Sequence, residues 1–135
     1  MAVFVDTSVW IAARNLDDVN HLRAKEILTS MLKGELGEIY TSDYILDEVV
    51  TLMLKRTGRL ELAIEMGEYI LKSPRIRKLR VTEEIFDDAW KKFKSLKSKP
   101  MSFTDCTSLV LMEKKGIEYI ASFDSGFDGL ARRIH

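Results

Sequence analysis

Four acidic residues lie where a carboxylate could take part in chemistry: Asp6, Glu48, Asp105 and Asp124. Asp6 directly follows an apolar run at residues 2–5, and Asp124 lies three positions beyond another apolar run, at residues 117–121. If such acids converge, each pair of unit charges about 4 Å apart repels by roughly 4 kcal/mol at an effective dielectric constant of about 20. Protons or a cation must then neutralise them, and ligands that are all oxygen favour Mg²⁺ or Mn²⁺.

Two of these acids fall on predicted helices, and each also has a purely structural interpretation. Glu48 lies on the flank of the apolar stripe of its helix, where a carboxylate is costly unless it is paired, protonated or bound to a metal. A salt bridge to Lys55 or Arg56 is the structural alternative. Asp105 follows Ser102 by three positions, which is the spacing of a capping box that stabilises the start of a helix.

The remaining acids lie in turns or on the surface. Asp6 has the alternative role of capping the following turn through Ser8. Asp124 and Asp128 stand in a glycine-containing segment, where aspartate is common because its side chain bonds nearby backbone amides. Asp47, the neighbour of Glu48, points away from the apolar stripe and is expected to be an ordinary surface residue.

The elements that must position these acids alternate between strand and helix. Short strands are predicted at residues 2–5, 38–41, 76–81, 117–121 and 132–134. Helices are predicted at residues 18–33, 42–55, 60–71, 82–96 and 102–116, with the expected N-caps Ser42, Thr82 and Ser102. Five apolar residues share one face of the helix at 82–96: Phe86, Ala89, Trp90, Phe93 and Leu96.

This order predicts a single α/β domain over residues 1–135, with a central, mostly parallel sheet of four to five strands covered on both faces. Parallel sheets bind their ligands outside the carboxyl ends of the strands. Asp6 and Asp124 are expected at that edge.

Four segments that contain the acids occur in order along the chain: Val3-Phe4-Val5-Asp6-Thr7-Ser8, Ile45-Leu46-Asp47-Glu48-Val49, Ser102-Phe103-Thr104-Asp105 and Ala121-Ser122-Phe123-Asp124-Ser125-Gly126-Phe127. With these segments the chain resembles the PIN-domain ribonucleases, in particular the VapC-like toxins of prokaryotic toxin–antitoxin pairs. The resemblance covers essentially the whole chain. It implies a three-layer α/β/α PIN-like fold and a metal-dependent endoribonuclease that hydrolyses RNA phosphodiester bonds.

The resemblance also assigns roles to individual residues. It implies that Mg²⁺ or Mn²⁺ is held by a quartet of catalytic acids: Asp6, Glu48, Asp105 and Asp124. Ser8 and Ser122 would support this site; many family members have Thr in place of Ser122, and the hydroxyl is kept. The family pattern does not require Asp128. Such an ion lowers the pKa of a bound water, which would attack the phosphodiester.

The resemblance further implies a homodimer and a cognate antitoxin protein, whose peptide lies across a hydrophobic groove. Candidate groove residues are Ile11, Leu52, Met53, Leu54 and the segment at 60–71, which has apolar residues nearly all round the helix. A helix of that kind must be buried by the core or by a partner.

The charges balance, because 21 Lys and Arg residues face 21 Asp and Glu residues. Zero net charge excludes a wholly basic nucleic-acid coat, although two runs without acids contain ten of the cations. Six cations from these runs are the candidate RNA-binding residues: Arg75, Arg77, Lys78, Lys91, Lys92 and Lys94. The structural alternative is a solvated face at each run.

Other function classes find little support. One cysteine, Cys106, and two histidines exclude a disulfide scaffold and a Cys/His zinc site, and a serine hydrolase would need a Gly-x-Ser-x-Gly segment that is absent. Without a signal peptide or long apolar run, a cytoplasmic protein with no membrane association is expected. Two alternatives stay open: a PIN nuclease for RNA processing outside a toxin–antitoxin pair, and a non-catalytic PIN-like module that binds RNA or protein.

Overall fold

Five strands form the central sheet of the computed structural model, which describes residues 1–135. In chain order they are β1 (Ala2–Val5), β2 (Glu38–Ser42), β3 (Ile76–Leu79), β4 (Tyr119–Ala121) and β5 (Arg132–Ile134). They lie side by side in the order β3-β2-β1-β4-β5, and all neighbours are parallel. Val3, Phe4 and Val5 in the central strand are fully buried, which is why β1 is an uninterrupted apolar run. The prediction of a mostly parallel sheet is confirmed.

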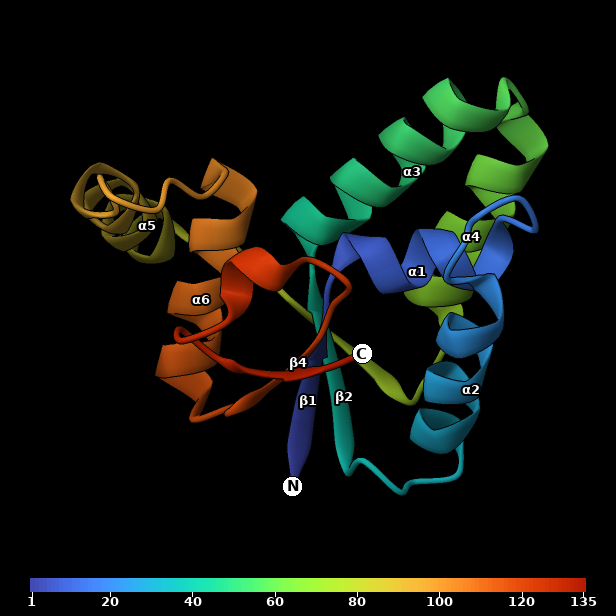
Figure 1. Cartoon of the computed structure of the whole chain (residues 1–135), viewed down its shortest axis with the longest axis horizontal. Coiled ribbons are helices and arrows are strands. Elements are labelled where there is room, and N and C mark those ends of the chain that lie inside the picture. The colour runs from blue at the N-terminus through green and yellow to red at the C-terminus, as the bar shows by residue number, and fades with distance from the viewer.

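Six α-helices cover this sheet: α1 (Thr7–Arg14), α2 (His21–Leu32), α3 (Asp43–Thr57), α4 (Leu60–Lys72), α5 (Glu83–Ser95) and α6 (Phe103–Lys115). A short 3-10 turn, η1 (Ser125–Phe127), follows β4. The chain runs from β1 through β2 to β3 in one direction and then crosses back to β4. Right-handed crossovers therefore place α1 to α4 on one side of the sheet and α5 and α6 on the other, as Figure 1 shows.

The predicted helix boundaries hold where local capping decides them. The hydroxyl oxygens of Ser42, Thr82 and Ser102 each accept a hydrogen bond from the backbone N–H three residues later. Gly58 and Gly116 take left-handed backbone conformations, with φ of 67° and 68°, directly after α3 and α6. Each capping residue lies within a few positions of the helix end that it determines, so the sequence alone is enough to predict these helix boundaries.

Two strands are shorter than the sequence predicts. The backbone N–H of Val81 donates to Asp43 Oδ1 at 3.0 Å instead of to a neighbouring strand, and β3 ends at Leu79. The backbone N–H of Ile117 donates to the carbonyl of Met112 at 2.9 Å and so completes the end of α6, which delays β4 to Tyr119.

Helix α1 is not among the elements that the sequence predicts. It begins directly after Asp6, and residues Val9, Trp10, Ile11 and Ala12 are all buried. A helix of eight residues that is apolar on nearly every side lacks the amphipathic spacing that reveals longer helices.

The apolar face predicted for α5 is only partly covered. Ile85 and Ala89 turn toward α6 and are buried, whereas Phe86, Trp90 and Phe93 lie beside Phe103 and remain about half exposed. The helix therefore packs along the border of its apolar stripe, and an aromatic strip stays on the surface.

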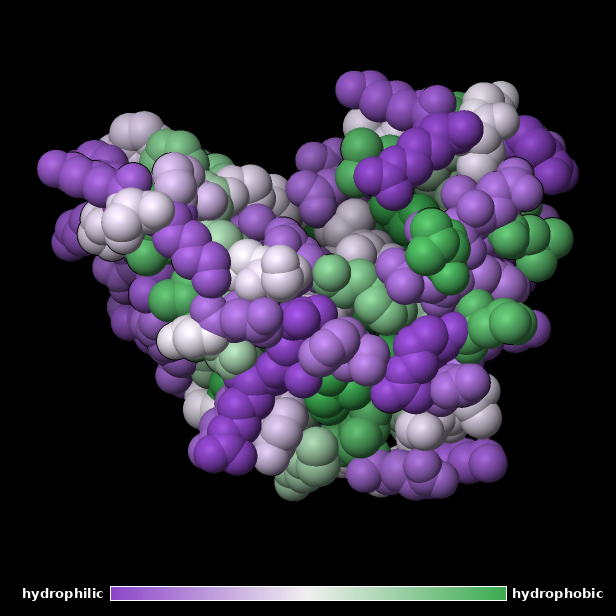
Figure 2. All heavy atoms as spheres, in the orientation of Figure 1, coloured by the Kyte–Doolittle hydropathy of each residue, from purple (hydrophilic) through white to green (hydrophobic).

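The carboxyl ends of β1 and β2 lie between α3 and the start of α6 (Figure 1). In the space-filling view a notch opens above this point, between a lobe with α5 and α6 and a lobe with α3 and α4 (Figure 2). None of the helices has the length and apolar character that a membrane span requires.

Candidate active site

A pocket of about 210 Å³ lies at the carboxyl edge of the sheet, and all four candidate acids line it. Asp6 comes from the end of β1, Glu48 from α3, Asp105 from α6 and Asp124 from the loop after β4. The fold thus collects four acids that are far apart in the sequence. The other lining residues are Thr7, Ser8, Ile11, Leu52, Arg56 and Ser102.

Asp6 is the most firmly held of these acids, and only 4% of its surface is exposed. Its backbone N–H donates to the carbonyl of Ala121 at 3.0 Å, which joins the end of β1 to the end of β4. Its carboxylate accepts hydrogen bonds from Ser122 Oγ at 2.8 Å and from Ser8 Oγ at 3.3 Å. The backbone hydrogen bond to β4 and the two serine hydroxyls together fix the position of this carboxylate.

Ser8 and Ser122 also connect Asp6 to the loop that carries Asp124. The backbone N–H of Phe123 donates to Ser8 Oγ at 3.0 Å, and the backbone N–H of Asp124 donates to Ser122 Oγ at 3.0 Å. Ser122 is fully buried. The structure thus places both predicted supporting residues in one hydrogen-bonded group between two of the acids.

Burial raises the pKa of the Asp6 carboxyl to about 6, and the negative charge of Glu48 acts in the same direction. The hydrogen bonds from Ser122, Ser8 and the backbone of Thr7 oppose this rise because they favour the charged form.

Asp105 combines the two roles that the sequence allows. Its backbone N–H donates to Ser102 Oγ at 3.0 Å, so the predicted cap of α6 is present. Burial, together with the negative charges of Asp6, Asp124 and Glu48, raises the pKa of its carboxyl to about 7, although the hydrogen bond from Ser102 opposes this rise. The cap explains the backbone position of Asp105 but leaves its carboxylate among the other acids.

Glu48 and Asp124 have no cationic partner, since neither takes part in any ion pair of the structure. The alternative pairing of Glu48 with a basic residue of α3 is therefore absent. Asp124 Oδ1 accepts a hydrogen bond from the backbone N–H of Gly126 at 2.8 Å, so the predicted turn role is present. Asp128 lies outside the pocket lining and pairs with Arg133 at 2.8 Å.

The donor atoms of the pocket suit a hard divalent cation, because every acidic ligand offers oxygen. Thr7 Oγ1, from the same lining, is buried without any hydrogen-bond partner. No three His, Cys, Asp or Glu side chains are grouped closely enough to form a ready-made metal cage. Mg²⁺ keeps several waters and often binds through only one or two carboxylates, so it does not require such a cage.

Arg56 is a lining residue that the sequence suggests only as a partner of Glu48. It is exposed, forms no ion pair and stands at the rim of the acid pocket. The signal that could have found it is the spacing of Glu48, Leu52 and Arg56, which recur every four residues and therefore share one side of α3.

A family model of the PIN domain matches residues 3–133. The chain belongs to the PIN-domain family. This PIN domain is 34% identical over 125 residues to the 23S rRNA-specific endonuclease VapC20 of Mycobacterium tuberculosis, an alignment that covers 93% of this chain and 91% of the relative. It is 29% identical over 128 residues to a VapC ribonuclease of Archaeoglobus fulgidus, covering 94% and 80% of the two chains.

Solved structures share the same architecture. The crystal structure of VapC20, described as a sarcin-ricin loop cleaving toxin, matches this PIN domain with a TM-score of 0.84 over 93% of this chain and 92% of the other. VapBC2 from Rickettsia felis, bound to a DNA fragment from its promoter, matches with a TM-score of 0.71 at 12% identity over 99% and 98% of the chains. At that identity the second match shows the fold alone.

In the first group of candidate RNA-binding residues, Arg75 and Arg77 lie beside Glu38 near the amino ends of β2 and β3, whereas Lys78 lies further along β3, opposite Thr41. Arg75 donates to the carbonyl of Leu32 at 2.7 Å, and Arg77 pairs with Glu38 at 3.2 Å. Lys78 Nζ donates to a backbone carbonyl at 3.0 Å. All three thus have partners within this PIN domain.

The second group lies on α5. Lys92 pairs with Glu113 of α6 at 2.8 Å. Lys91 and Lys94 are exposed and take part in no ion pair. These two cations keep their charge available to a partner.

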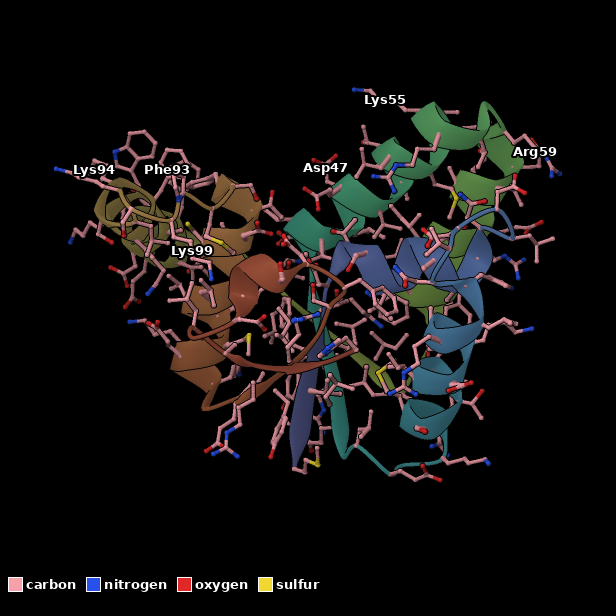
Figure 3. The ribbon with its side chains drawn as sticks, viewed as in Figure 1. Asp47, Lys55, Arg59, Phe93, Lys94 and Lys99 are labelled. Atoms are coloured by element: carbon pink, nitrogen blue, oxygen red, sulfur yellow. The ribbon has the colours of Figure 1, made fainter.

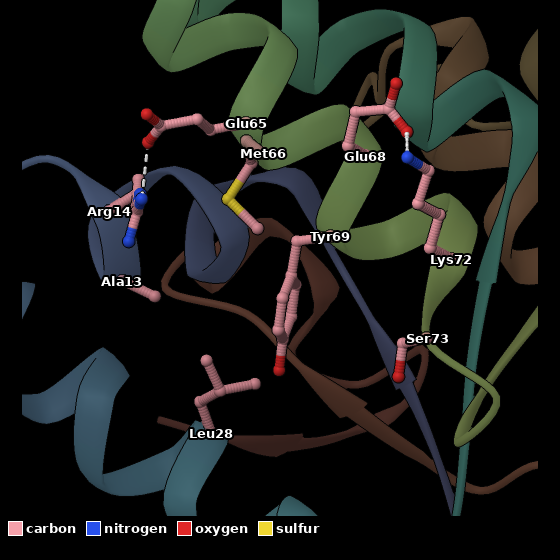
Figure 4. A pocket seen from close by; sticks show the side chains of 9 residues that line it. All are labelled: Ala13, Arg14, Leu28, Glu65, Met66, Glu68, Tyr69, Lys72 and Ser73. Carbon is pink, nitrogen blue, oxygen red and sulfur yellow. Dashed lines mark hydrogen bonds and ion pairs between the residues drawn. The ribbon is translucent and has the colours of Figure 1, made fainter.

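A larger pocket, of about 660 Å³, lies between α1, α2 and α4 (Figure 4). Its charges neutralise one another, because Arg14 pairs with Glu65, and Glu68 pairs with Lys72 at 3.0 Å. Burial raises the pKa of the Tyr69 hydroxyl, which also lines this pocket. If the functional site were chosen by pocket volume alone, this pocket would be selected instead of the acid pocket.

Proposed function

We propose that this PIN domain is an Mg²⁺- or Mn²⁺-dependent endoribonuclease that hydrolyses RNA phosphodiester bonds and serves as the toxin of a toxin–antitoxin pair. The observation that carries this proposal is the pocket lined by four carboxylates, none of which forms an ion pair. Such a group destabilises the fold unless protons or a cation neutralise it. VapC20 is named a 23S rRNA-specific endonuclease, and its 34% identity to this chain supports the same class of reaction here.

When bound, Mg²⁺ or Mn²⁺ supplies activation of water and neutralises charge on the leaving oxygen. Asp6, Glu48, Asp105 and Asp124 would hold the ion. Asp6 sets its position most firmly, since strand β1 and two serine hydroxyls fix its carboxylate.

Two further groups act on substrate and water. The Asp105 carboxyl, already named among the groups that would hold the ion, also lies at the start of α6, where it faces the water that the ion would activate. Arg56 at the rim offers a guanidinium that can bind a phosphate oxygen of the RNA through charge-assisted hydrogen bonds. The pocket thus contains groups for metal, water and phosphate.

An antitoxin protein as partner, and a homodimer as assembly, belong to the same proposal. Aliphatic side chains line a shallow groove between α3 and α4, among them the exposed Leu54, Ile64 and Leu71. This surface suits an apolar segment of a protein partner. The candidate groove residues Ile11 and Met53 are wrong for that role, because both are buried in the core.

The test is cleavage of a structured RNA under three conditions: wild-type protein with Mg²⁺, wild-type protein with EDTA, and Asp6→Asn with Mg²⁺. We expect cleavage only in the first, and equal cleavage in all three would overturn the proposal. Growth arrest on expression, lost in Asp105→Asn, would support the toxin role. Cleavage in vitro without growth arrest would leave a nuclease and contradict the toxin.

A further inference from the structure

Three aromatic side chains on α5 are exposed to solvent: Phe86 at 44%, Trp90 at 49% and Phe93 at 39%. The rings of Trp90 and Phe93 stack on each other, with centroids 5.6 Å apart and an angle of 15° between their planes. Large apolar groups gathered on a surface mark an interaction site more often than an accident of packing. Phe86, Trp90 and Phe93 are named the aromatic face below.

Phe103, at the start of α6, connects the aromatic face to the segments that carry two of the acids. The Phe103 ring lies 5.0 to 6.4 Å, centroid to centroid, from each ring of the aromatic face. It lies 6.3 Å from the ring of Tyr44 on α3. Phe103 precedes Asp105 by two residues, and Tyr44 precedes Glu48 by one helical turn. A strand of RNA that binds the aromatic face could therefore extend toward the acid pocket.

Unpaired lysines flank the carboxyl-terminal half of the aromatic face, whereas the exposed acid Asp87 stands between Phe86 and Trp90 in the chain. Lys94 follows Phe93 directly, and Figure 3 shows both on the lobe that borders the notch, with Lys99 on the same side. Neither Lys91 nor Lys94 takes part in an ion pair. Exposed rings next to free lysines are the combination that binds single-stranded nucleic acid, since rings stack on bases and lysines bind phosphates.

The groove between α3 and α4 provides a contrast. Its apolar lining is aliphatic and contains no aromatic ring, and it suits the packing of a protein helix. The aromatic face instead offers flat rings, which Phe103 connects to the start of α6, where Asp105 lies. Both its chemistry and its position favour a nucleobase over a second protein surface.

We propose that the aromatic face, together with Lys94, binds an unpaired RNA base next to the phosphodiester at the acid pocket. This inference rests on the proposed function and deepens it, because it names the surface of the protein that binds a base of the RNA during cleavage. A base stacked on Trp90 or Phe93 would hold the strand while its neighbouring phosphate reaches the carboxylates.

The test measures binding of a single-stranded RNA oligonucleotide to the Asp6→Asn protein, which is expected to bind without cleaving. A series of the same RNA carries one abasic site, moved along the strand a nucleotide at a time, so that one base is removed while all phosphates stay. Adding Trp90→Ala is expected to weaken binding of the intact RNA about tenfold. It should leave unchanged the affinity for the RNA whose abasic site replaces the stacked base.

Leu32→Ala is the matched control, because Leu32 is an apolar residue of similar exposure, 38%, on α2 and lines neither the acid pocket nor the groove between α3 and α4. It should not change binding of any RNA in the series. Trp90→Phe keeps a ring and should retain most of the affinity, which also guards against a loss caused by misfolding. Equal weakening by Trp90→Ala for every RNA in the series would overturn the inference.

Light scattering on the wild type and on Trp90→Ala tests the remaining explanation, which is that the aromatic face is a contact between two copies of the chain. If Trp90→Ala turns a dimer into a monomer and leaves RNA affinity unchanged, the aromatic face is a contact between two copies and the inference is wrong. Cleavage by the wild type with Mg²⁺ is scored separately. A protein that binds bases on this face but never cleaves would contradict the proposed function and not this inference.

Discussion

The acid pocket and the larger pocket between α1, α2 and α4 differ in how their charges are arranged. In the larger pocket, Arg14 pairs with Glu65 and Glu68 pairs with Lys72. In the acid pocket four carboxylates share the lining with a single cation, Arg56, and none of them forms an ion pair. The charges that line the pocket of about 660 Å³ are paired, whereas the carboxylates that line the pocket of about 210 Å³ are not.

The volume of a pocket therefore does not identify the functional site of this molecule. A fold gains nothing in stability from collecting like charges, and the raised pKa values of Asp6 and Asp105 record that cost. Perturbed carboxyls that gather in one pocket are therefore the better sign of function. Changes in the acid pocket should therefore affect RNA cleavage and the pH dependence of stability, whereas changes in the larger pocket should not.

The largest effect is expected from Glu48→Gln. It removes one negative charge from the acid pocket and should lower the rate of RNA cleavage about a hundredfold or more, since metal binding contributes several kcal/mol to such reactions. The measurement is the initial rate of cleavage of a labelled RNA at saturating Mg²⁺.

Asp47→Asn is the matched control for this change. Asp47 is the preceding residue on α3, is exposed, and does not line the pocket. The same change of charge there should alter the rate by no more than about twofold. Equal losses in the two variants would mean that the general charge of α3, and not the pocket, controls cleavage.

A medium effect is expected on stability as a function of pH. The folded-state pKa values of Asp6 and Asp105, about 6 and about 7, both lie above the ordinary value of 3.8. Between these values the folded state binds protons that the unfolded state has lost, so folding stability falls as pH rises from about 4 to about 7. Asp6 alone contributes on the order of 2–3 kcal/mol to this fall, because it is almost completely buried.

Urea denaturation in EDTA across this pH range measures the fall. Asp6→Asn should flatten the curve, and Mg²⁺ should stabilise the wild type more at pH 8 than at pH 5, because the cation replaces the lost protons. A Glu65→Gln protein, changed only in the larger pocket, should keep the wild-type slope. A slope of the opposite sign between about pH 4 and pH 7 would show that these carboxyls are not perturbed as described.

The sequence is sufficient where structure depends on neighbouring residues. Ser42, Thr82 and Ser102 mark helix starts because a side chain reaches a backbone N–H only three residues away. The strand-end position of Asp6 follows equally from a local apolar run. The strand order also indicates that Asp6 and Asp124 share one edge of the sheet, since parallel strands bring their carboxyl ends together, whereas Glu48 and Asp105 join them only through the family resemblance.

What the sequence does not contain is the choice among distant partners. Lys92 was a candidate for RNA, yet it pairs with Glu113, 21 positions away in the chain. The bond from Ser122 to Asp6 spans 116 positions, and only the folded sheet brings the two groups within 2.8 Å. The exposure of Trp90 depends on how α5 is rotated against α6, which its amphipathic pattern leaves undecided.

The smallest effect is expected from Glu65→Gln in the larger pocket. The ion pair of Glu65 with Arg14 is half exposed, with 51% of each side chain accessible, and such pairs contribute at most about 1 kcal/mol to stability. The midpoint of thermal unfolding should therefore shift by at most about 4 °C, which is the shift that 1 kcal/mol produces in a domain of this size. The rate of RNA cleavage should stay within about twofold of the wild type. A loss of cleavage rate comparable with that of Glu48→Gln would mean that the larger pocket also serves the reaction. The contrast between the two pockets would then no longer identify the active site.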